Sequence, residues 1–249
     1  MAAEDWIIAR LHQRIDWADS LATFVLDGEV PDFLPGQFLR VGMDLGEAEP
    51  TSRPYSLASA PGAPLELFVV RVEGGALTPS LFEAPLGAPI FVHRRAAGVF
   101  TLEGVPSASE LWLIGTGTGL APYISMLRDG GLFSRFERVI LVQSVRYPTQ
   151  LAYADEIAAE VAARGGRLTH LRLVSQGAAP GALRGRVTTA LHDGSLEAAA
   201  GSALVPERAQ VLLCGNPDMV IEMQSLLGER GMSRNRRRAP GHVTAEKFW

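Results

Sequence analysis

The chain has little cysteine: Cys214 is the single thiol among 249 residues. One thiol excludes an internal disulfide and a cysteine-ligated iron–sulfur cluster, and it favours a reducing compartment. No apolar run approaches the roughly 18 residues that a membrane-spanning helix needs. The acidic start of the chain is unlike a secretory signal. We therefore expect a cytoplasmic protein with no membrane partner and no metal site.

A basic excess is also absent, because 27 acidic residues outnumber 23 lysines and arginines and leave a formal charge of −4. Proteins that bind nucleic acid usually carry clustered positive charge, so no nucleic-acid partner is expected. A hydrophobic content of 47% with 20% charged residues is typical of a globular protein with a substantial core. The length suffices for two domains of ordinary size. We expect a two-domain monomer.

Short strand-like runs, separated by Gly, Pro and Asp, occupy the chain up to Leu102. These runs are residues 20–26, 37–41, 65–72 and 88–92, with a possible short helix at 79–86. Regular short strands with turn residues between them are typical of an antiparallel barrel or sandwich. We predict an antiparallel β barrel over residues 1–103.

From Glu110 onward, short apolar runs alternate with helical stretches. The strand-like runs are residues 111–114, 138–145, 168–174 and 210–213, and the helical ones are 121–127, 151–164, 188–196 and 218–230. This alternation predicts an α/β domain with a parallel sheet over residues 104–249. Residues 197–203 are expected to be a connection of small residues.

The run Arg53-Pro54-Tyr55-Ser56 places a cation, a flat ring and a hydroxyl within four residues. Pro54 has no backbone N–H and therefore suits the edge of a sheet. In an extended run, Arg53 and Tyr55 point to one side and Ser56 to the other. Such a segment suits a phosphate beside a planar ring system, but a solvated arginine and a half-buried tyrosine explain it equally well.

Three further segments carry candidate chemistry. The glycine-rich loop 115–119 joins a predicted strand to a helix whose first N–H groups suit a pyrophosphate, although such loops also arise for packing reasons. Cys214 follows the last predicted strand, where ligands of open α/β sheets bind, or it is simply a small buried side chain. The chain ends in Phe248 and Trp249, which either stack on a flat cofactor or dock as an ordinary tail.

Taken in this order, these segments resemble the ferredoxin/flavodoxin–NADP reductase family, in particular its bacterial branch. The resemblance covers nearly the whole chain and rests on residues 35–38, 53–56, 98–102, 115–122, 214–217 and 244–249. It implies an FAD-binding barrel, an NADP-binding α/β domain and an aromatic tail that returns to the flavin. The implied reaction is hydride transfer between nicotinamide C4 and flavin N5.

The resemblance also implies roles for single residues. Arg53 would pair with the FAD pyrophosphate, Tyr55 would lie on the isoalloxazine, and Ser56 would place its hydroxyl near N5. The other FAD residues would be Pro54, Phe68, Val69, Val70, Arg71, Ala76, Leu77, Thr78, Thr118, Phe248 and Trp249. Ser56, Cys214 and Glu246 would be catalytic, with Cys214 beside the nicotinamide and Glu246 passing protons.

For the nucleotide, the resemblance implies a site formed by Thr116, Arg146, Arg184, Arg186, Cys214 and Asp218. Arg146 and Arg186 match arginines that hold the 2′-phosphate. Gln176 stands where the family has another such arginine, and a neutral amide cannot neutralise a phosphate. Arg184 is the residue that would compensate. The preference for NADPH over NADH is therefore open.

The implied partner is ferredoxin or flavodoxin, an acidic carrier of single electrons. Candidate basic docking residues are Arg94, Arg95 and the run 234–238. The same scaffold also suits a reductase that serves an oxygenase, or one that reduces free flavin or ferric chelates. A nucleotide-binding sensor without turnover is a further alternative, but it would not require Ser56, Cys214 and Glu246 together.

Overall fold

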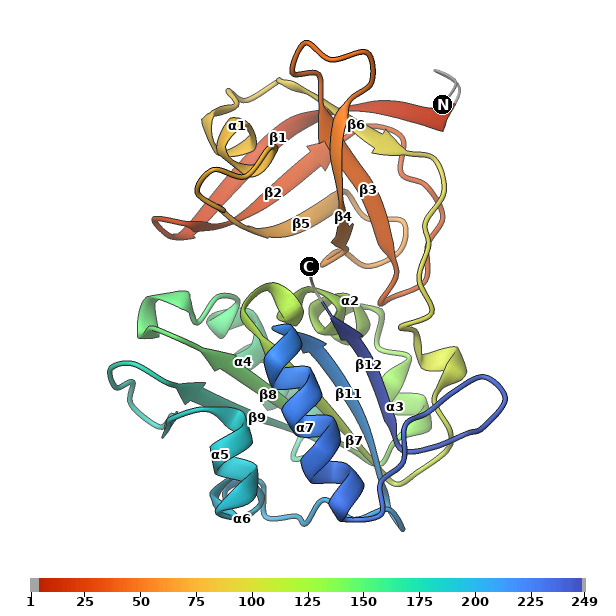
Figure 1. The fold of residues 1–249 in the computed structure, drawn as a ribbon, viewed down its shortest axis with the longest axis vertical. Coiled ribbons are helices and arrows are strands. Elements are labelled where there is room, and N and C mark those ends of the chain that lie inside the picture. The colour runs from red at the N-terminus through yellow and green to blue at the C-terminus, as the bar shows by residue number, and fades with distance from the viewer. Residues whose placement is uncertain (1–4, 248–249) are drawn as a thin grey trace. The chain divides into compact units, whose positions relative to one another are not determined.

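The computed structural model describes residues 5–247, which fall into two compact units (Figure 1). The first unit contains the chain up to Thr101 together with Ala121–Asp129. The second contains Leu102–Leu120 and the chain from Gly130 onward. Each unit has its own apolar core. The chain passes between the units three times, whereas the sequence predicts a single boundary after residue 103.

The first unit is built on a six-stranded sheet with the order β4-β3-β6-β1-β2-β5, in which every neighbouring pair is antiparallel. The strands are β1 (Trp6–Ala18), β2 (Leu21–Asp27), β3 (Phe38–Met43), β4 (Thr51–Ser56), β5 (Leu65–Val70) and β6 (Pro89–His93). A bridge between Leu57 and Leu67 joins the two ends of the sheet. This closure confirms the predicted antiparallel barrel, and α1 (Thr78–Glu83) is its short helix.

The barrel core comes from the inward-facing residues of its strands. Phe24, Leu39, Leu67 and Ile90 are all fully buried. Strand β1 was not predicted, because irregularities in its pairing with β2 break the alternation of apolar and polar residues that marks a strand. Strand β4 is an end strand of the sheet order, as the missing N–H of Pro54 requires.

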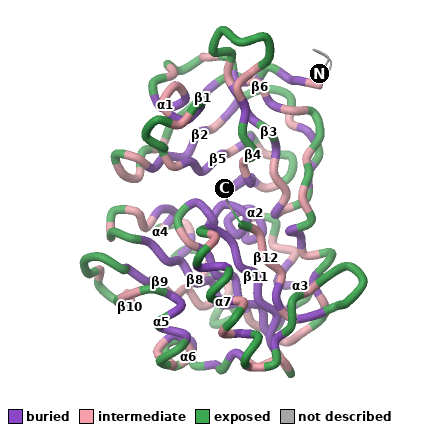
Figure 2. Tube along the Cα trace, viewed as in Figure 1, coloured by how far each residue is buried: buried purple, intermediate pink, exposed green. Residues whose placement is uncertain are grey.

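The second unit contains a six-stranded parallel sheet with the order β10-β9-β8-β7-β11-β12. Its strands are β7 (Glu110–Thr116), β8 (Arg138–Val145), β9 (Leu168–Val174), β10 (Leu183–Arg184), β11 (Ala209–Gly215) and β12 (Val243–Lys247). Figure 2 shows β7, β8 and β11 as buried strands, which explains the apolar runs within them. The parallel sheet confirms the predicted α/β fold.

Five α-helices accompany this sheet in the part of the chain that the structure describes: α3 (Leu132–Arg135), α4 (Ala154–Arg164), α5 (Val187–His192), α6 (Ser195–Ala200) and α7 (Pro217–Glu229). Single turns of 3-10 helix are η2 (Leu102–Gly104), η3 (Gly117–Leu120) and η4 (Pro148–Gln150). The helix α2 (Ala121–Asp129) follows η3 but belongs to the first unit. No helix within residues 5–247 is long and apolar enough to cross a bilayer.

The second unit differs from the sequence analysis in two places. Residues 197–203 are not a plain connection, because α6 covers most of them and buries Leu196 in the core. Residues 243–247, for which no strand was predicted, form the edge strand β12, and Val243 packs into the same core. Phe248 and Trp249, the predicted aromatic cover, lie outside the described residues.

Candidate active site

The run Arg53–Ser56 lies in β4, and burial increases along it from Arg53 to Ser56. Ser56 is buried, with 5% of its surface exposed, whereas Arg53 and Pro54 are exposed and Tyr55 is half-buried. Pairing with β3 fixes this register and sets Ser56 opposite Phe38 and Tyr55 opposite Leu39. The strand therefore presents a cation and a ring away from the buried hydroxyl.

The electrostatics of this strand suit an anionic ligand with a flat group beside it. Burial raises the pKa of Tyr55 to about 12, and the charge of Arg53 opposes that rise only in part. The phenol therefore stays neutral at physiological pH. Arg53 uses Nη1 to donate to the Ser52 carbonyl at 2.8 Å. A guanidinium has five N–H donors, so others are available to a phosphate.

The second predicted FAD segment lies where β5 ends and α1 begins. Phe68, Val69 and Leu77 are buried side chains of the barrel, so only their backbone groups can reach a ligand. Thr78 joins the two elements, because its Oγ1 accepts a hydrogen bond from Val72 N at 2.9 Å. Val70 is half-buried and Ala76 is exposed. Arg71 is exposed and pairs with Glu83 at 2.8 Å.

The glycine loop after β7 uses its glycines in two different ways. A Cβ on Gly119 would lie 2.6 Å from the Cys214 carbonyl carbon, so Gly119 is required for packing against the end of β11. Gly117 has a φ of +54° and nothing within 4 Å of a Cβ position. The packing explanation therefore holds for Gly119, while Gly117 leaves room at the carboxyl edge of the sheet. Thr118, which lies between them, is buried.

The ends of β7 and β11 are joined tightly. Thr116 Oγ1 accepts a hydrogen bond from Asn216 N at 2.9 Å. Gly215 has a φ of +126°, and a Cβ there would lie 2.6 Å from the Thr116 carbonyl oxygen. Asn216 in turn caps α7, because its Oδ1 accepts from the backbone N–H of Asp218 at 2.9 Å. Asp218 itself is exposed.

Cys214 and Glu246 face each other in the register of β11 and β12. On its other side Cys214 pairs with Gly115 of β7. The thiol is fully buried, and burial raises its pKa well above the usual value, with the charge of Glu246 as a second cause. The thiol therefore stays protonated and is a poor nucleophile. Two of the three predicted catalytic residues are thus brought together.

The predicted phosphate-binding arginines gather where β8, β9 and β10 end. Arg146 follows β8, Arg184 lies in β10, and Arg186 precedes α5; all three side chains are exposed. Gln176 belongs to the same group, because its backbone N–H donates to the Arg146 carbonyl at 2.7 Å. Tyr147 was not predicted here, yet it is 43% exposed and its ring lies 5.4 Å from the Arg146 guanidinium. An exposed tyrosine next to an arginine was the available signal.

A histidine lies one strand away from these arginines. His170 on β9 has Nε2 at 3.2 Å from Gln143 Oε1, and Gln143 Nε2 donates to the Ala152 carbonyl at 3.2 Å. Burial and, to a smaller extent, the charge of Arg172 together lower the pKa of His170 to about 4. The imidazole is therefore neutral at physiological pH and donates to Gln143 through Nε2.

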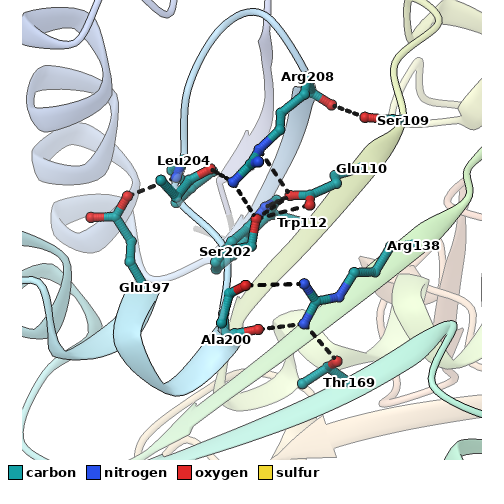
Figure 3. A network of polar contacts seen from close by, with 12 residues as sticks. Ser109, Glu110, Trp112, Arg138, Thr169, Glu197, Ala200, Ser202, Leu204 and Arg208 are labelled. Carbon is teal, nitrogen blue, oxygen red and sulfur yellow. Dashed lines mark hydrogen bonds and ion pairs between the residues drawn. The ribbon is translucent and has the colours of Figure 1, made fainter.

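At the amino edge of the sheet, where its strands begin, the polar side chains form a network with one another (Figure 3). Ser202 Oγ lies 2.8 and 2.7 Å from the two carboxylate oxygens of the buried Glu110. Arg208 Nη2 donates to Ser202 Oγ at 2.7 Å, and its Nε lies 3.8 Å from Glu110 Oε2. Arg138 donates to the Ala200 carbonyl at the end of α6. These groups connect the starts of β7, β8 and β11 and serve the fold.

Comparison with known proteins gives a consistent family. Residues 113–225 match the family model of the oxidoreductase NAD-binding domain. The flavodoxin/ferredoxin–NADP reductase of Escherichia coli (strain K12) is 36% identical over 247 residues, which cover 98% of this chain and 99% of that protein. The ferredoxin–NADP reductase of Pseudomonas aeruginosa is 30% identical and covers 93% of both chains.

Solved structures agree with this match. The ferredoxin NADP+ reductase from Neisseria gonorrhoeae, crystallised with bound FAD and NADP, superposes with a TM-score of 0.92 at 29% identity and covers 98% of this chain and 99% of that one. The FAD/NAD-binding domain of a Vibrio cholerae nitric oxide dioxygenase, at 20% identity and a TM-score of 0.78, shares the fold. The predicted resemblance is confirmed: the chain belongs to the flavodoxin/ferredoxin–NADP reductase family.

Proposed function

We propose that this protein is an FAD-dependent oxidoreductase that transfers electrons between NADP(H) and ferredoxin or flavodoxin. The observation that carries the proposal is the register of β11 and β12, which sets Cys214 beside Glu246 next to the glycine loop. The names of full-length relatives and the FAD and NADP in the Neisseria structure support it.

The barrel residues fit FAD. Arg53 offers an exposed guanidinium to the pyrophosphate, and Tyr55 offers a neutral, half-buried ring to the isoalloxazine. When bound, FAD takes up a hydride as an electron pair and releases electrons singly, which links a nicotinamide to a one-electron carrier. Ser56 would hold its hydroxyl near flavin N5, where the buried side of β4 fixes it in place.

The α/β unit fits a dinucleotide. Nothing lies within 4 Å of a Cβ position at Gly117, so a nicotinamide nucleotide could come close to the backbone there, at the carboxyl edge of the sheet. Arg146, Arg184 and Arg186 form an exposed cationic group there, as a 2′-phosphate requires. Gln176 contributes a neutral amide to this group, so discrimination against NADH depends on the arginines.

In this proposal Cys214 helps to position the nicotinamide, and Glu246 transfers protons. Cys214 is buried and stays protonated, so it contributes to the shape of the nicotinamide site and does not act as a nucleophile. Glu246 lies on an edge strand and is half-buried, so its carboxylate can exchange a proton with water and with a group in the site. Hydride transfer itself depends mostly on alignment of the two rings.

For the carrier we propose basic docking residues on both units. Arg234, Arg236, Arg237 and Arg238 are exposed in a turn between α7 and β12. The turn is held by paired backbone hydrogen bonds between Arg236 and Ala239, both at 3.0 Å. Asn235 anchors it further by donating to the Gly104 carbonyl at 2.7 Å. On the barrel, Arg95 is exposed and Arg94 pairs with Glu29 at 3.2 Å.

The test starts with the purified protein, which we expect to be yellow and to lose its visible absorbance under anaerobic NADPH. Colourless protein that retains no added FAD would refute the proposal. Turnover with ferricyanide separates an enzyme from a flavin-binding sensor. Reduction of ferredoxin and of flavodoxin in separate assays, against cytochrome P450 and ferric chelates as other acceptors, identifies the acceptor class. The cytoplasmic location and the monomeric state stay predictions.

A further inference from the structure

The helix α2 directly follows the glycine loop in the chain, yet it is held by the barrel. The helix after the first strand of an α/β sheet ordinarily packs on that sheet. Here Ser125 Oγ donates to the Ser59 carbonyl at 2.6 Å. Arg128 Nη1 donates to the Ala58 carbonyl at 3.0 Å and lies 2.8 Å from Glu66 Oε2. We call these five residues the α2 clamp.

The clamp is shielded from water. Ser125 and Ser59 are fully buried, so losing the hydroxyl would leave a buried carbonyl without this donor. The Arg128 and Glu66 side chains are 24% and 22% exposed, which makes this pair less screened than a fully exposed one. Apolar contacts add to it: the rings of Tyr123 and Phe100 are 6.1 Å apart.

Close packing fixes the helix from a second direction. Gly36 has a φ of +98°, and a Cβ there would lie 2.7 Å from the Met126 methyl group. Every residue from Ala121 to Leu127 is buried. The helix is therefore an integral part of the first unit and not a loosely attached connection.

The α2 clamp binds the chain just after β4, the strand that contains the predicted flavin residues. Ala58 and Ser59 follow Ser56 by two and three residues, and Ala58 N donates to the Glu66 carbonyl at 2.9 Å where the barrel closes. At its other end, α2 begins directly after η3, which contains Thr118. Pro122 in the first turn of α2 restricts the backbone at this junction.

We propose that Ser125 and Arg128 are positioning residues for hydride transfer, because they hold α2 on the barrel and thereby order the glycine loop that directly precedes this helix in the chain. This inference rests on the proposed function. The covalent path from Ser125 to Thr118 is seven residues long, and all seven residues after Thr118 belong to the 3-10 turn η3 or to helix α2. A shift of α2 is therefore passed directly to the loop that faces the nicotinamide. Misplacement by about 1 Å can slow a reaction by about 100-fold.

The experiment uses FAD-loaded protein with the substitutions Ser125→Ala, Arg128→Ala and Arg128→Lys. The matched control is Arg14→Ala, which also removes a barrel arginine that binds a carbonyl and a carboxylate, Phe82 O at 2.6 Å and Asp16 at 3.0 Å. Four quantities are measured: the limiting rate of FAD reduction by NADPH, the Kd of NADP+, the FAD content, and hydrogen exchange of amides 115–120 without nucleotide.

We expect Ser125→Ala and Arg128→Ala each to lower the limiting rate by about ten-fold and to speed exchange of amides 115–120. FAD content and the Kd of NADP+ should stay within about two-fold of the Arg14→Ala control. Arg128→Lys should recover part of the rate, because an ammonium still reaches Glu66 but lacks the planar fork. That partial rescue distinguishes positioning from general loss of stability.

Rates and exchange within two-fold of wild type in flavin-loaded Ser125→Ala and Arg128→Ala would overturn the inference and leave the proposed function standing. If Arg128→Ala does not fold or loses FAD, Ser125→Ala decides, since it removes a single oxygen atom. Wild-type protein that NADPH does not reduce would refute the proposed function. Amide exchange at 115–120 in the variants would then still show whether the clamp orders the loop.

Discussion

The two edges of the parallel sheet use their polar side chains in opposite ways. At the amino edge, Glu110, Ser202 and Arg208 contact one another and leave little capacity for a ligand (Figure 3). At the carboxyl edge, Arg146 and Arg186 are exposed and form no ion pair among residues 5–247. Charges that satisfy each other stabilise a fold, whereas charges held apart from partners are available for binding. Substitutions at the two edges should therefore affect different quantities.

The largest effect is expected from Arg146→Ala combined with Arg186→Ala. Under the proposed function each substitution removes a charge-assisted contact to the 2′-phosphate, so we expect kcat/KM for NADPH to fall by about 100-fold or more. The value for NADH should change by less than about three-fold, and the free energy of unfolding should not change measurably. Steady-state kinetics with both nucleotides checks this. The control Arg164→Ala removes an arginine paired with Glu160 on α4, and equal loss in that variant would contradict the comparison.

The converse substitution is Glu110→Ala at the amino edge. It removes the carboxylate that Ser202 and Arg208 contact, so we expect the free energy of unfolding to fall by about 2 kcal/mol. The rate per bound FAD should be unchanged. Chemical denaturation followed by fluorescence measures the first quantity. Glu160→Ala, which breaks a half-buried i,i+4 pair within α4, should cost only about 0.5 kcal/mol. If Glu110→Ala instead lowers activity at full stability, the amino edge has a role beyond the fold.

Acid should weaken the fold through His170, which lies in the sheet between the two edges. Its folded pKa of about 4 lies below the ordinary 6.5, so the unfolded chain binds the proton more readily. Stability is therefore present above about pH 6.5 and is lost as the pH falls toward 4, by about 3 kcal/mol from this group. Unfolding curves of the wild type and of His170→Gln between these pH values give the difference. Parallel curves would show that His170 titrates normally.

The smallest expected effect comes from a substitution at the carboxyl edge that changes the preference between the two nucleotides. Gln176→Arg adds a cation next to Arg146, and we expect the preference for NADPH over NADH to rise about five-fold, mainly through the KM for NADPH. Gln176→Asn is the matched neutral control and should leave the preference within two-fold. If Gln176→Arg has no effect while the double arginine variant is impaired, Arg146 and Arg186 already saturate the phosphate.

The sequence predicted those parts of the fold that bury a continuous apolar face. Strands β7 and β11 were found because each contains a short continuous apolar run, as is typical of buried parallel strands. Strand β12 was missed because an edge strand covered on one side can be half polar, as its sequence VTAEK is. Helix α6 was missed because its sequence, SLEAAA, is short and rich in small residues, which is also typical of a connection between elements. In each case tertiary packing, rather than local preference, decided the structure.

The candidate site was predictable to the extent that motifs are local. In Arg53–Ser56 the cation, the ring and the hydroxyl lie within four residues, so this motif could be identified from the sequence alone. The pairing of Cys214 with Glu246 joins residues far apart in the chain and depends on β12 occupying the edge next to β11. Tyr147 could be assigned to the site only once the structure showed which strand ends lie next to one another. The roles of individual residues toward FAD and NADP stay predictions.

The threefold passage of the chain between its two units has a consequence for how the protein can be divided. A single cut after residue 103 would give a fragment that carries α2 but lacks Ala58, Ser59 and Glu66, to which that helix is bonded. The other fragment would keep those groups but lose the helix that covers them. Exchange of one half for that of a relative would therefore succeed only if α2 travels with the barrel. The two halves are separate in their cores but not interchangeable as modules.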